Sequence, residues 1–134
     1  MYKRQLVHDS LGDYENALFH YGKAEEVYLA VYGRDHLTVA KTEENIAVVY
    51  QKQGKFEEAL EMYSAVLEIK TRVCGQHSLD VADTKYNMAL LHKERGERDV
   101  ARQLFLECEV IRAKVYGPDH SKTKEAAQQT RGCE

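Results

Sequence analysis

The chain is poor in residues that interrupt helices or build cross-links. Its 134 residues include one proline, no tryptophan and three cysteines. Because proline lacks a backbone N–H and clashes with the preceding helical turn, its scarcity favours long helices with short connections. No segment approaches 18 consecutive apolar residues, so we expect no membrane-spanning helix. Cys74, Cys108 and Cys133 are odd in number and share no close spacing, which favours a reduced, cytoplasmic compartment.

The chain also lacks a concentrated basic region. The formal net charge is −3, with 31% charged and 43% hydrophobic residues, which is typical of a globular protein. General nucleic-acid binding requires a basic surface, so we expect no nucleic-acid partner. The first ten residues contain no apolar core of the kind that an export signal needs.

An internal repeat of 42 residues is the main feature of the sequence. Segments that begin and end with glycine recur at Gly12–Gly33, Gly54–Gly75 and Gly96–Gly117. When residues 12–53 are paired with residues 54–95, 14 positions are identical. Self-similarity at such a period indicates a solenoid built of stacked helical units.

Apolar spacing within each unit predicts one long and one shorter helix. In the second unit Ala59, Tyr63 and Val66 recur at intervals of three and four, which places them on one helical face. No stretch alternates with a period of two, so we expect no strand. The predicted helices are 2–11, 13–32, 37–53, 56–74, 79–95, 98–116 and 122–130.

These helices predict an all-α fold, a right-handed superhelical solenoid of antiparallel helix pairs in one domain, 1–134. Residues 1–33 form a truncated first repeat, residues 37–74 and 79–116 form full repeats, and residues 121–134 form a polar terminal helix or tail. We expect Asp35 or Thr38, and later Ser121, to cap the helices that follow the connections. A start in mid-repeat suggests a piece of a longer array.

The helix pairs resemble a known repeat family. Asn45-Ile46-Ala47, then Tyr50, Gly54, Phe56, Ala59 and Tyr63 occur at the spacing of a tetratricopeptide repeat. The 42-residue period, with V-A-x-T-x-x-N-x-A at 39–47 and 81–89, is similar to the kinesin light chain type. The third unit departs from the pattern, since Arg98 and Arg102 replace Phe56 and Leu60.

The resemblance implies that the first helix of each pair lines a concave face, which binds an extended peptide or a helix. Projecting the pattern onto this chain gives a candidate groove of twelve residues: Lys41, Glu44, Asn45, Val48, Lys52, Asp83, Tyr86, Asn87, Leu90, Lys93, Glu125 and Gln129.

Asn45 and Asn87 occupy one register in successive repeats. An amide offers donors and an acceptor, which suits contact with a peptide backbone. The alternative is that each asparagine bonds the neighbouring repeat or its own helix. Either interpretation explains why a residue of mediocre helix propensity occurs twice at this register.

Lysines in the candidate groove favour an acidic partner. Lys41, Lys52 and Lys93 would attract acidic residues that flank an apolar anchor. The negative charges of Glu44 and Asp83 reduce the positive potential of the groove. The alternative is that these lysines are ordinary solvated charges. A full carboxylate clamp, known in some tetratricopeptide domains, is disfavoured because Glu44 stands where it requires a lysine.

No arrangement of residues indicates catalysis, a cofactor or a metal ion. Phosphate-binding and dinucleotide motifs are missing. His36, His77 and His120 fall in connections of successive repeats, which pack about 10 Å apart, too far to share one zinc ion. We therefore expect a non-enzymatic module that binds a protein or peptide. The alternative is a structural spacer or assembly element of a larger repeat-containing signalling or scaffold protein, with ends that stack on other repeats. A separate expectation is that the isolated chain self-associates through its repeat ends.

Overall fold

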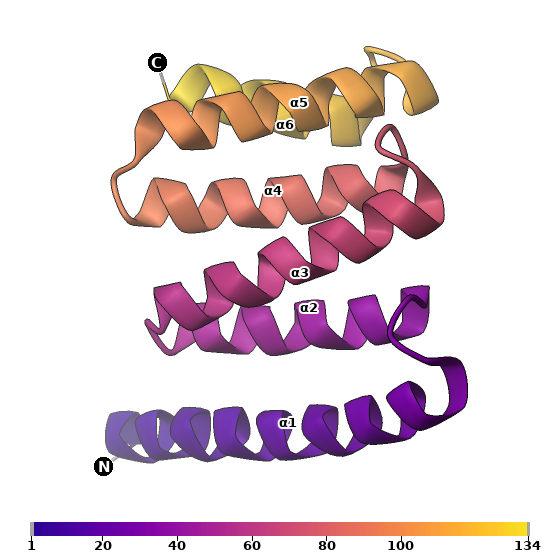
Figure 1. The fold of residues 1–134 in the computed structure, drawn as a ribbon. Coiled ribbons are helices and arrows are strands. Elements are labelled where there is room, and N and C mark those ends of the chain that lie inside the picture. Colours follow the sequence, from indigo (N-terminus) through magenta and orange to yellow (C-terminus); the bar gives the residue numbers. More distant parts are fainter. Residues whose placement is uncertain (1, 134) are drawn as a thin grey trace.

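In the part of the chain that the structure describes, six helices are stacked in sequence order, and successive helices run antiparallel (Figure 1). The computed structural model describes the backbone of residues 2–133 and the side chains of residues 13–133. Within this part of the chain there is no strand, and no helix is long and apolar enough to cross a bilayer. The helices are α1 (Tyr2–Tyr32), α2 (Leu37–Lys52), α3 (Phe56–Cys74), α4 (Leu79–Glu94), α5 (Arg98–Tyr116) and α6 (Ser121–Gly132). The predicted all-α solenoid is confirmed.

The core is built from small residues at helix crossings and large residues between layers. Ala47, Ala59, Ala89 and Ala101 are fully buried, which lets the helix backbones approach closely. Tyr63 is fully buried beside Ala47 and Ala59. Each helix packs on its neighbours in sequence, so the core is a series of layers rather than one central cluster.

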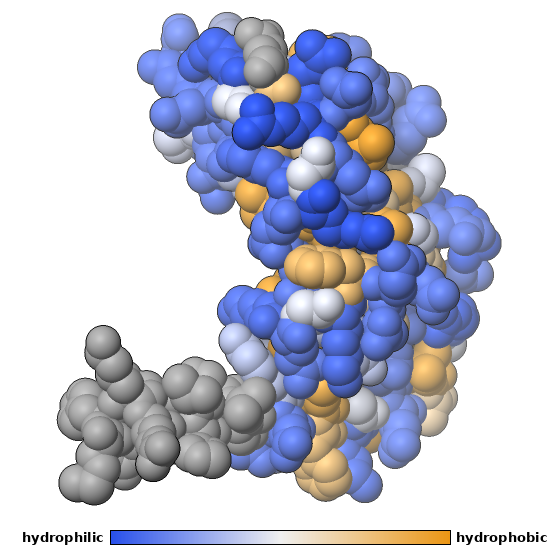
Figure 2. Space-filling model, turned by 90° about the vertical axis from the view of Figure 1, so that its left-hand side faces the viewer, coloured by the Kyte–Doolittle hydropathy of each residue, from blue (hydrophilic) through white to orange (hydrophobic). Residues whose placement is uncertain are grey.

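The stack is curved. In Figure 1, α3 passes in front of α2, and α5 passes in front of α6. Figure 2 views the molecule from the left-hand end of Figure 1, and its outline is hollowed on the side away from α3 and α5. The concave face is therefore formed by α2, α4 and α6, the first helices of the pairs.

The long helices α3 and α5 each end at a glycine. Gly75 has φ 93° and Gly117 has φ 94°. A side chain at either position would be strained, because L-residues rarely adopt this conformation. The chain can thus turn sharply into the next helix of the stack.

Histidine side chains cap α2 and α6. His36 Nδ1 accepts a hydrogen bond from the N–H of Thr38 at 3.0 Å, and its ring stacks on Tyr32 at 4.1 Å. His120 and Tyr116 repeat this arrangement before α6. The predicted caps, Asp35 or Thr38 and Ser121, are wrong, because the histidine lies one residue before the helix with its ring fixed by the tyrosine.

Ser78 occupies the same register in the unit between them. Its Oγ accepts a hydrogen bond from the N–H of Val81 at 3.2 Å and caps α4. Histidine and serine side chains therefore both cap helices at this register of the repeat.

The expected break between helices 2–11 and 13–32 is wrong. Helix α1 is continuous from Tyr2 to Tyr32 and passes through Gly12. Glycine permits a turn but does not require one, and continued helical hydrogen bonding satisfies the backbone here.

The last helix, α6, is polar on its outer surface. Ser121, Lys124, Gln128 and Arg131 are exposed, whereas Thr123 and Ala126 are buried against the preceding layer. A polar outer face is what the end of a solenoid needs in water.

A carboxyl pair lies between α1 and α2. Arg34 Nη1 donates to Glu43 Oε2 at 3.1 Å, while Glu43 Oε1 is buried and lacks a partner among the described residues. Burial, followed by a hydrogen bond to Glu43 and its charge, raises the pKa of Glu25 to about 7. Protonation of Glu25 below this value therefore relieves the like-charge contact with Glu43.

The carboxyl pair of Glu25 and Glu43 predicts that the fold is more stable in mild acid. Because the pKa of Glu25 is raised in the folded state, its protonation stabilises the fold below about pH 7, and this contribution is lost as pH rises through that value. Glu25→Gln keeps a donor and removes the titration. Since Glu25 is only partly buried, we expect a gain of about 1 kcal/mol at pH 8 and less at pH 5, measured by urea unfolding. Equal effects at both pH values would contradict this.

The caps predict a matched pair of variants. His36→Ala should lower the free energy of unfolding by about 1 kcal/mol, because the N–H of Thr38 loses its acceptor. His36→Ser should retain most of the stability, since Ser78 already performs this task at the same register. Urea unfolding of the three proteins measures the difference. If the serine variant is as unstable as the alanine variant, ring stacking on Tyr32 rather than capping is the stabilising contact.

Candidate functional site

The twelve residues predicted for the groove lie on α2, α4 and α6, and all of them keep some solvent exposure. The structure gathers eight of them around two adjoining hollows. The first, which we name the charged hollow, has a volume of about 400 Å³. It is lined by Glu44, Asp83, Tyr86, Asn87, Arg112, Lys122 and Glu125.

The second hollow has a volume of about 280 Å³, and we name it the Leu90 hollow. It is lined by Val48, Gln51, Lys52, Tyr63, Asn87, Leu90 and Glu94. Asn87 belongs to both hollows. The remaining predicted residues, Lys41, Asn45, Lys93 and Gln129, do not line either one.

A buried lysine supports the charged hollow from behind. Lys70 on α3 is 2% exposed, and its Nζ lies 2.6 Å from Glu44 Oε1. The same ammonium donates to Thr84 Oγ1 at 2.9 Å and to the carbonyl oxygen of Asp80 at 3.3 Å. A buried charge needs such compensation, because its desolvation would otherwise cost several kcal/mol.

Glu44 is the acceptor at the centre of this network. Its Oε2 accepts from Thr84 Oγ1 at 2.9 Å and from Asn87 Nδ2 at 3.2 Å. Together with the bond from Lys70, both oxygens are occupied. The network joins α2, α3 and α4, so it fixes the relative position of two repeats.

Arg112 repeats the role of Lys70 one unit later. It is 3% exposed, and its guanidinium lies 3.3 Å from both Asp83 and Glu125 and donates to the carbonyl oxygen of Lys122 at 3.0 Å. The guanidinium also lies over the ring of Tyr86, 4.8 Å from its centroid. Tyr86 occupies the register of Glu44, so the aromatic face takes the place of the carboxylate.

The Leu90 hollow is less polar at its base. Tyr63 is fully buried, and burial raises the pKa of its phenol. Its hydroxyl donates to Gln51 Oε1 at 2.9 Å, and Gln51 in turn donates to Glu94 at 3.1 Å. The partly exposed side chains of Val48 and Leu90 provide apolar surface beside this chain of bonds.

The two asparagines differ in their surroundings. Asn87 bonds Glu44 of the neighbouring repeat, as in the structural interpretation of this pair. Asn45 is exposed and makes no side-chain hydrogen bond with the described residues. Of the lysines, Lys41 and Lys52 are exposed, and Lys93 Nζ donates to Gln129 at 2.8 Å.

Sequence reasoning missed Lys70 and Arg112. Each is a basic residue within an otherwise apolar helix face, and they are separated by the 42-residue repeat. A charge on a buried face, repeated at the period of the fold, is the signal that could have identified them.

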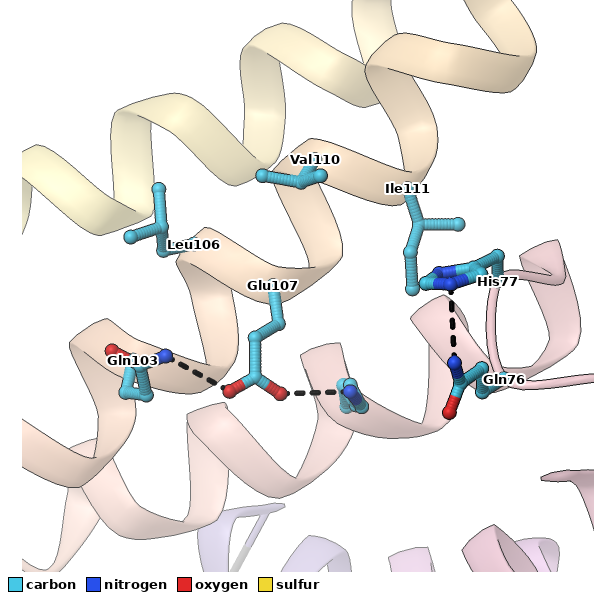
Figure 3. Close-up of a pocket in the computed structure, with 8 residues that line it drawn as sticks. Gln76, His77, Gln103, Leu106, Glu107, Val110 and Ile111 are labelled. Atoms are coloured by element: carbon cyan, nitrogen blue, oxygen red, sulfur yellow. Dashed lines mark hydrogen bonds and ion pairs between the residues drawn. The ribbon is translucent and has the colours of Figure 1, made fainter.

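A further hollow, also missed, lies on the outer side of the stack. Figure 3 shows Leu106 and Val110 on α5 beside Glu107, with His77 from the connection before α4. The volume is about 340 Å³. Lys85 Nζ lies 2.7 Å from Glu107, so the polar base is internally paired, while Leu106 and Val110 remain more than 40% exposed.

The thiols of Cys74 and Cys108 are not activated. Burial raises the pKa of Cys108 to about 11. Burial and the nearby carboxylate of Asp80 also raise the pKa of Cys74. A nucleophilic cysteine needs the opposite shift. Among the described residues, no group of three metal-ligating side chains gathers, and His36 and His120 serve as helix caps.

Comparison with known proteins also identifies a helical-repeat fold. A family model described as Tetratricopeptide repeat matches residues 6–72 and 38–109. No curated protein sequence matches significantly. The structure of BtubC (BKLC) from P. vanneervenii has a TM-score of 0.75 at 22% identity, covering 91% of this chain and 54% of that one. A putative kinesin light chain from Podosopora anserina with nearly identical TPR-like repeats has a TM-score of 0.80 at 15% identity, covering 98% and 62%.

Antiparallel helix pairs, stacked with buried alanines at the crossings, define the class as a helical-repeat solenoid. The chain belongs to the tetratricopeptide repeat family, and its fold is similar to that of the putative kinesin light chain repeats. Such a fold is typical of non-catalytic modules that bind other proteins on an extended concave surface. The chain spans between half and two thirds of the length of the two solved structures.

The buried ion pair predicts non-additive effects on stability. Lys70→Met should lower the free energy of unfolding by about 3 kcal/mol, because Glu44 is left as an uncompensated, largely buried charge. The double variant Lys70→Met/Glu44→Leu should lose less than the sum of the single variants. Urea unfolding of the four proteins measures this coupling. Additive losses would show that the two side chains do not act as a pair.

Proposed function

We propose that this chain is a non-catalytic, cytoplasmic module that binds a peptide or helical segment of a partner protein along α2, α4 and α6. The observation that carries the proposal is the pair of adjoining hollows on the concave face, joined at Asn87. A continuous surface of this kind can follow an extended segment over several residues.

The Leu90 hollow suits one apolar anchor. Val48 and Leu90 supply apolar surface, while Lys52 and Glu94 lie at its border. Interface energy concentrates in a few such well-packed anchors. A leucine or aromatic side chain of the partner is the occupant that this chemistry favours.

Three lysines on α2 and α4 favour acidic residues beside the anchor. Lys41 and Lys52 are exposed on α2, and Lys93 is exposed on α4. Their positive charge would speed the encounter with an acidic segment and select against a basic one. A role similar to the cargo- and adaptor-binding repeats of kinesin light chains follows from this proposal, without a metal ion, cofactor or nucleic acid.

A peptide array tests the proposal. Ten-residue peptides carry a central leucine or aromatic residue with aspartate and glutamate at varied flanking positions, and the tightest binder becomes the probe peptide. Asn87→Ala should weaken binding of the probe by about 1–3 kcal/mol, because a polar partner is left unmet. Lys52→Ala and Lys93→Ala should act more weakly, and their effects should fade as salt concentration rises. Fluorescence polarisation measures all of these.

The controls separate the two faces of the stack. Replacing the anchor by serine, or the acidic residues by lysine, should abolish binding of the probe. Glu61→Lys, on the exposed outer side of α3, should leave binding unchanged. If no peptide of the array binds, or if Glu61→Lys abolishes binding while Asn45→Ala and Asn87→Ala do not, the concave face is not the binding site.

A specific observation favours the alternative, an assembly element that self-associates through its first helix. Phe19, Val27 and Val31 on α1 are 62%, 57% and 66% exposed, which is unusual for large apolar side chains. We expect sedimentation velocity to show concentration-dependent dimers that Phe19→Ser weakens, whereas Tyr14→Ser, at a partly buried position of α1, has a smaller effect. A monomer at all concentrations would exclude this alternative.

A further inference from the structure

A fourth hollow lies between α2 and α3, and it is the repeat equivalent of the outer hollow shown in Figure 3. Its volume is about 270 Å³, and we name it the acidic hollow. Glu43 and Ala65 line it, 42 residues before Lys85 and Glu107 of the outer hollow. The two hollows thus occupy the same place in successive repeats, on the outer side of the stack, but their charges differ.

The charges of the outer hollow compensate each other. Lys85 Nζ lies 2.7 Å from Glu107 Oε1, and Gln103 Nε2 donates to Glu107 Oε2 at 3.0 Å (Figure 3). In the acidic hollow, a glutamate, Glu43, replaces the lysine, and Ala65 replaces the glutamate of the outer helix. Helix α3 therefore supplies no charge of opposite sign at the place where α5 does.

Glu43 is compensated only in part. It is 5% exposed, and its Oε2 accepts a hydrogen bond from Arg34, whose side chain is 55% exposed. Its Oε1 is buried and has no hydrogen-bond partner among the described residues. Burial, followed by contact with Glu43, raises the pKa of Glu25 to about 7, so the neighbour on α1 is a second acid. The ammonium of Lys55 lies over the Tyr50 ring instead, 5.8 Å from its centroid.

Two further carboxylates line the acidic hollow from α3. Glu58 and Glu61 are exposed, and neither forms an ion pair or a side-chain hydrogen bond with the described residues. Met62 and Ala65 provide partly exposed apolar surface beside them. No group of three metal-ligating side chains gathers in the described part of the chain. The lining therefore suits a side chain with an apolar stem and a cationic end.

A guanidinium fits this lining better than an ammonium. It can donate to two carboxylates at once, whereas an ammonium acts as a point charge. The chain already holds one arginine in this way, because Arg112 lies 3.3 Å from both Asp83 and Glu125 and is almost completely buried.

We propose that the acidic hollow binds an arginine side chain of a partner segment, with its guanidinium on the carboxylate of Glu43 and its stem on Met62. The partner thus supplies the opposite charge that Lys85 and Glu107 supply for each other in the next unit. This site lies outside the concave face, so the inference goes beyond the proposed function.

Nuclear magnetic resonance with short peptides tests the inference. The acetylated, amidated hexapeptides carry one central arginine and no other charge, with varied apolar residues beside it. Their partners carry citrulline, which has the same shape without the charge. Addition of the arginine peptides to the isotope-labelled chain should give saturable shifts at Glu43, Glu58 and Met62. The citrulline peptides should bind at least about tenfold more weakly, because charge-assisted hydrogen bonds are lost.

A lysine placed in the acidic hollow provides a matched pair of variants. Ala65→Lys places an ammonium opposite Glu43, reversing the pair of Lys85 and Glu107, and should abolish binding of the arginine peptides. Ser64→Lys adds the same charge at an exposed neighbouring position that does not line the hollow, and should keep most of the binding. Circular dichroism checks that both variants remain helical, and Glu43→Gln, which should weaken binding about tenfold, supplies a third variant.

The outcomes separate this inference from the concave-face proposal. Glu61→Lys should weaken binding of the arginine peptides while leaving the acidic probe peptide unaffected. Equal binding of arginine and citrulline peptides, equal losses in Ala65→Lys and Ser64→Lys, or no binding at all would overturn the inference and leave the proposed function intact. Shifts at Glu43 and Glu58 on dilution of the protein alone would show that a second copy supplies the cation, and would overturn the assignment to a separate partner.

Discussion

The concave face depends on positive charges that are buried behind it. Lys70 and Arg112 extend from the outer helices into the layer of the inner helices, and each is only 2–3% exposed. Neither charge could remain there without acceptors, so the acidic and carbonyl groups of two successive inner helices must converge on it. This requirement sets the spacing between repeats and, with it, the position of the groove side chains.

The same requirement gives the two units different surfaces. Lys70 is compensated by Glu44, whose oxygens are fully occupied within the protein. Arg112 is compensated by Asp83 and Glu125, which are 61% and 45% exposed, and by the face of Tyr86. Both units therefore contain a buried positive charge, but its acceptors differ. Around Lys70 the carboxylate is saturated and bonds the amide of Asn87, whereas around Arg112 the carboxylates remain exposed. Differences between repeats, rather than the repeat itself, give a solenoid its specificity.

Most of the fold could be predicted from the sequence, because the 42-residue period and the spacing of residues such as Ala59 and Tyr63 are local signals of buried helical faces. The break expected at Gly12 was wrong because a glycine shows only what the backbone can do, not what its neighbours require. The capping role of His36 was also missed, since it depends on the ring of Tyr32 four residues earlier.

The site could be predicted only in outline. Register along a helix indicates which residues share a face, and the twelve predicted residues do lie on α2, α4 and α6. Register does not show which side chains bond one another across helices. The contact between Asn87 and Glu44 joins residues 43 positions apart, and its dependence on Lys70 follows from burial that no local pattern encodes.

The central claim is that partner segments bind on the concave face, and nuclear magnetic resonance tests it most directly. Backbone and side-chain amide shifts of the isotope-labelled protein are followed while the probe peptide is added. We expect the largest changes at Asn87, Leu90 and their neighbours on α2 and α4, including the side-chain NH₂ of Asn87, with little change on the outer side of α3 and α5. Shifts concentrated instead around Leu106 and Val110 on α5, with the concave face unchanged, would contradict the account.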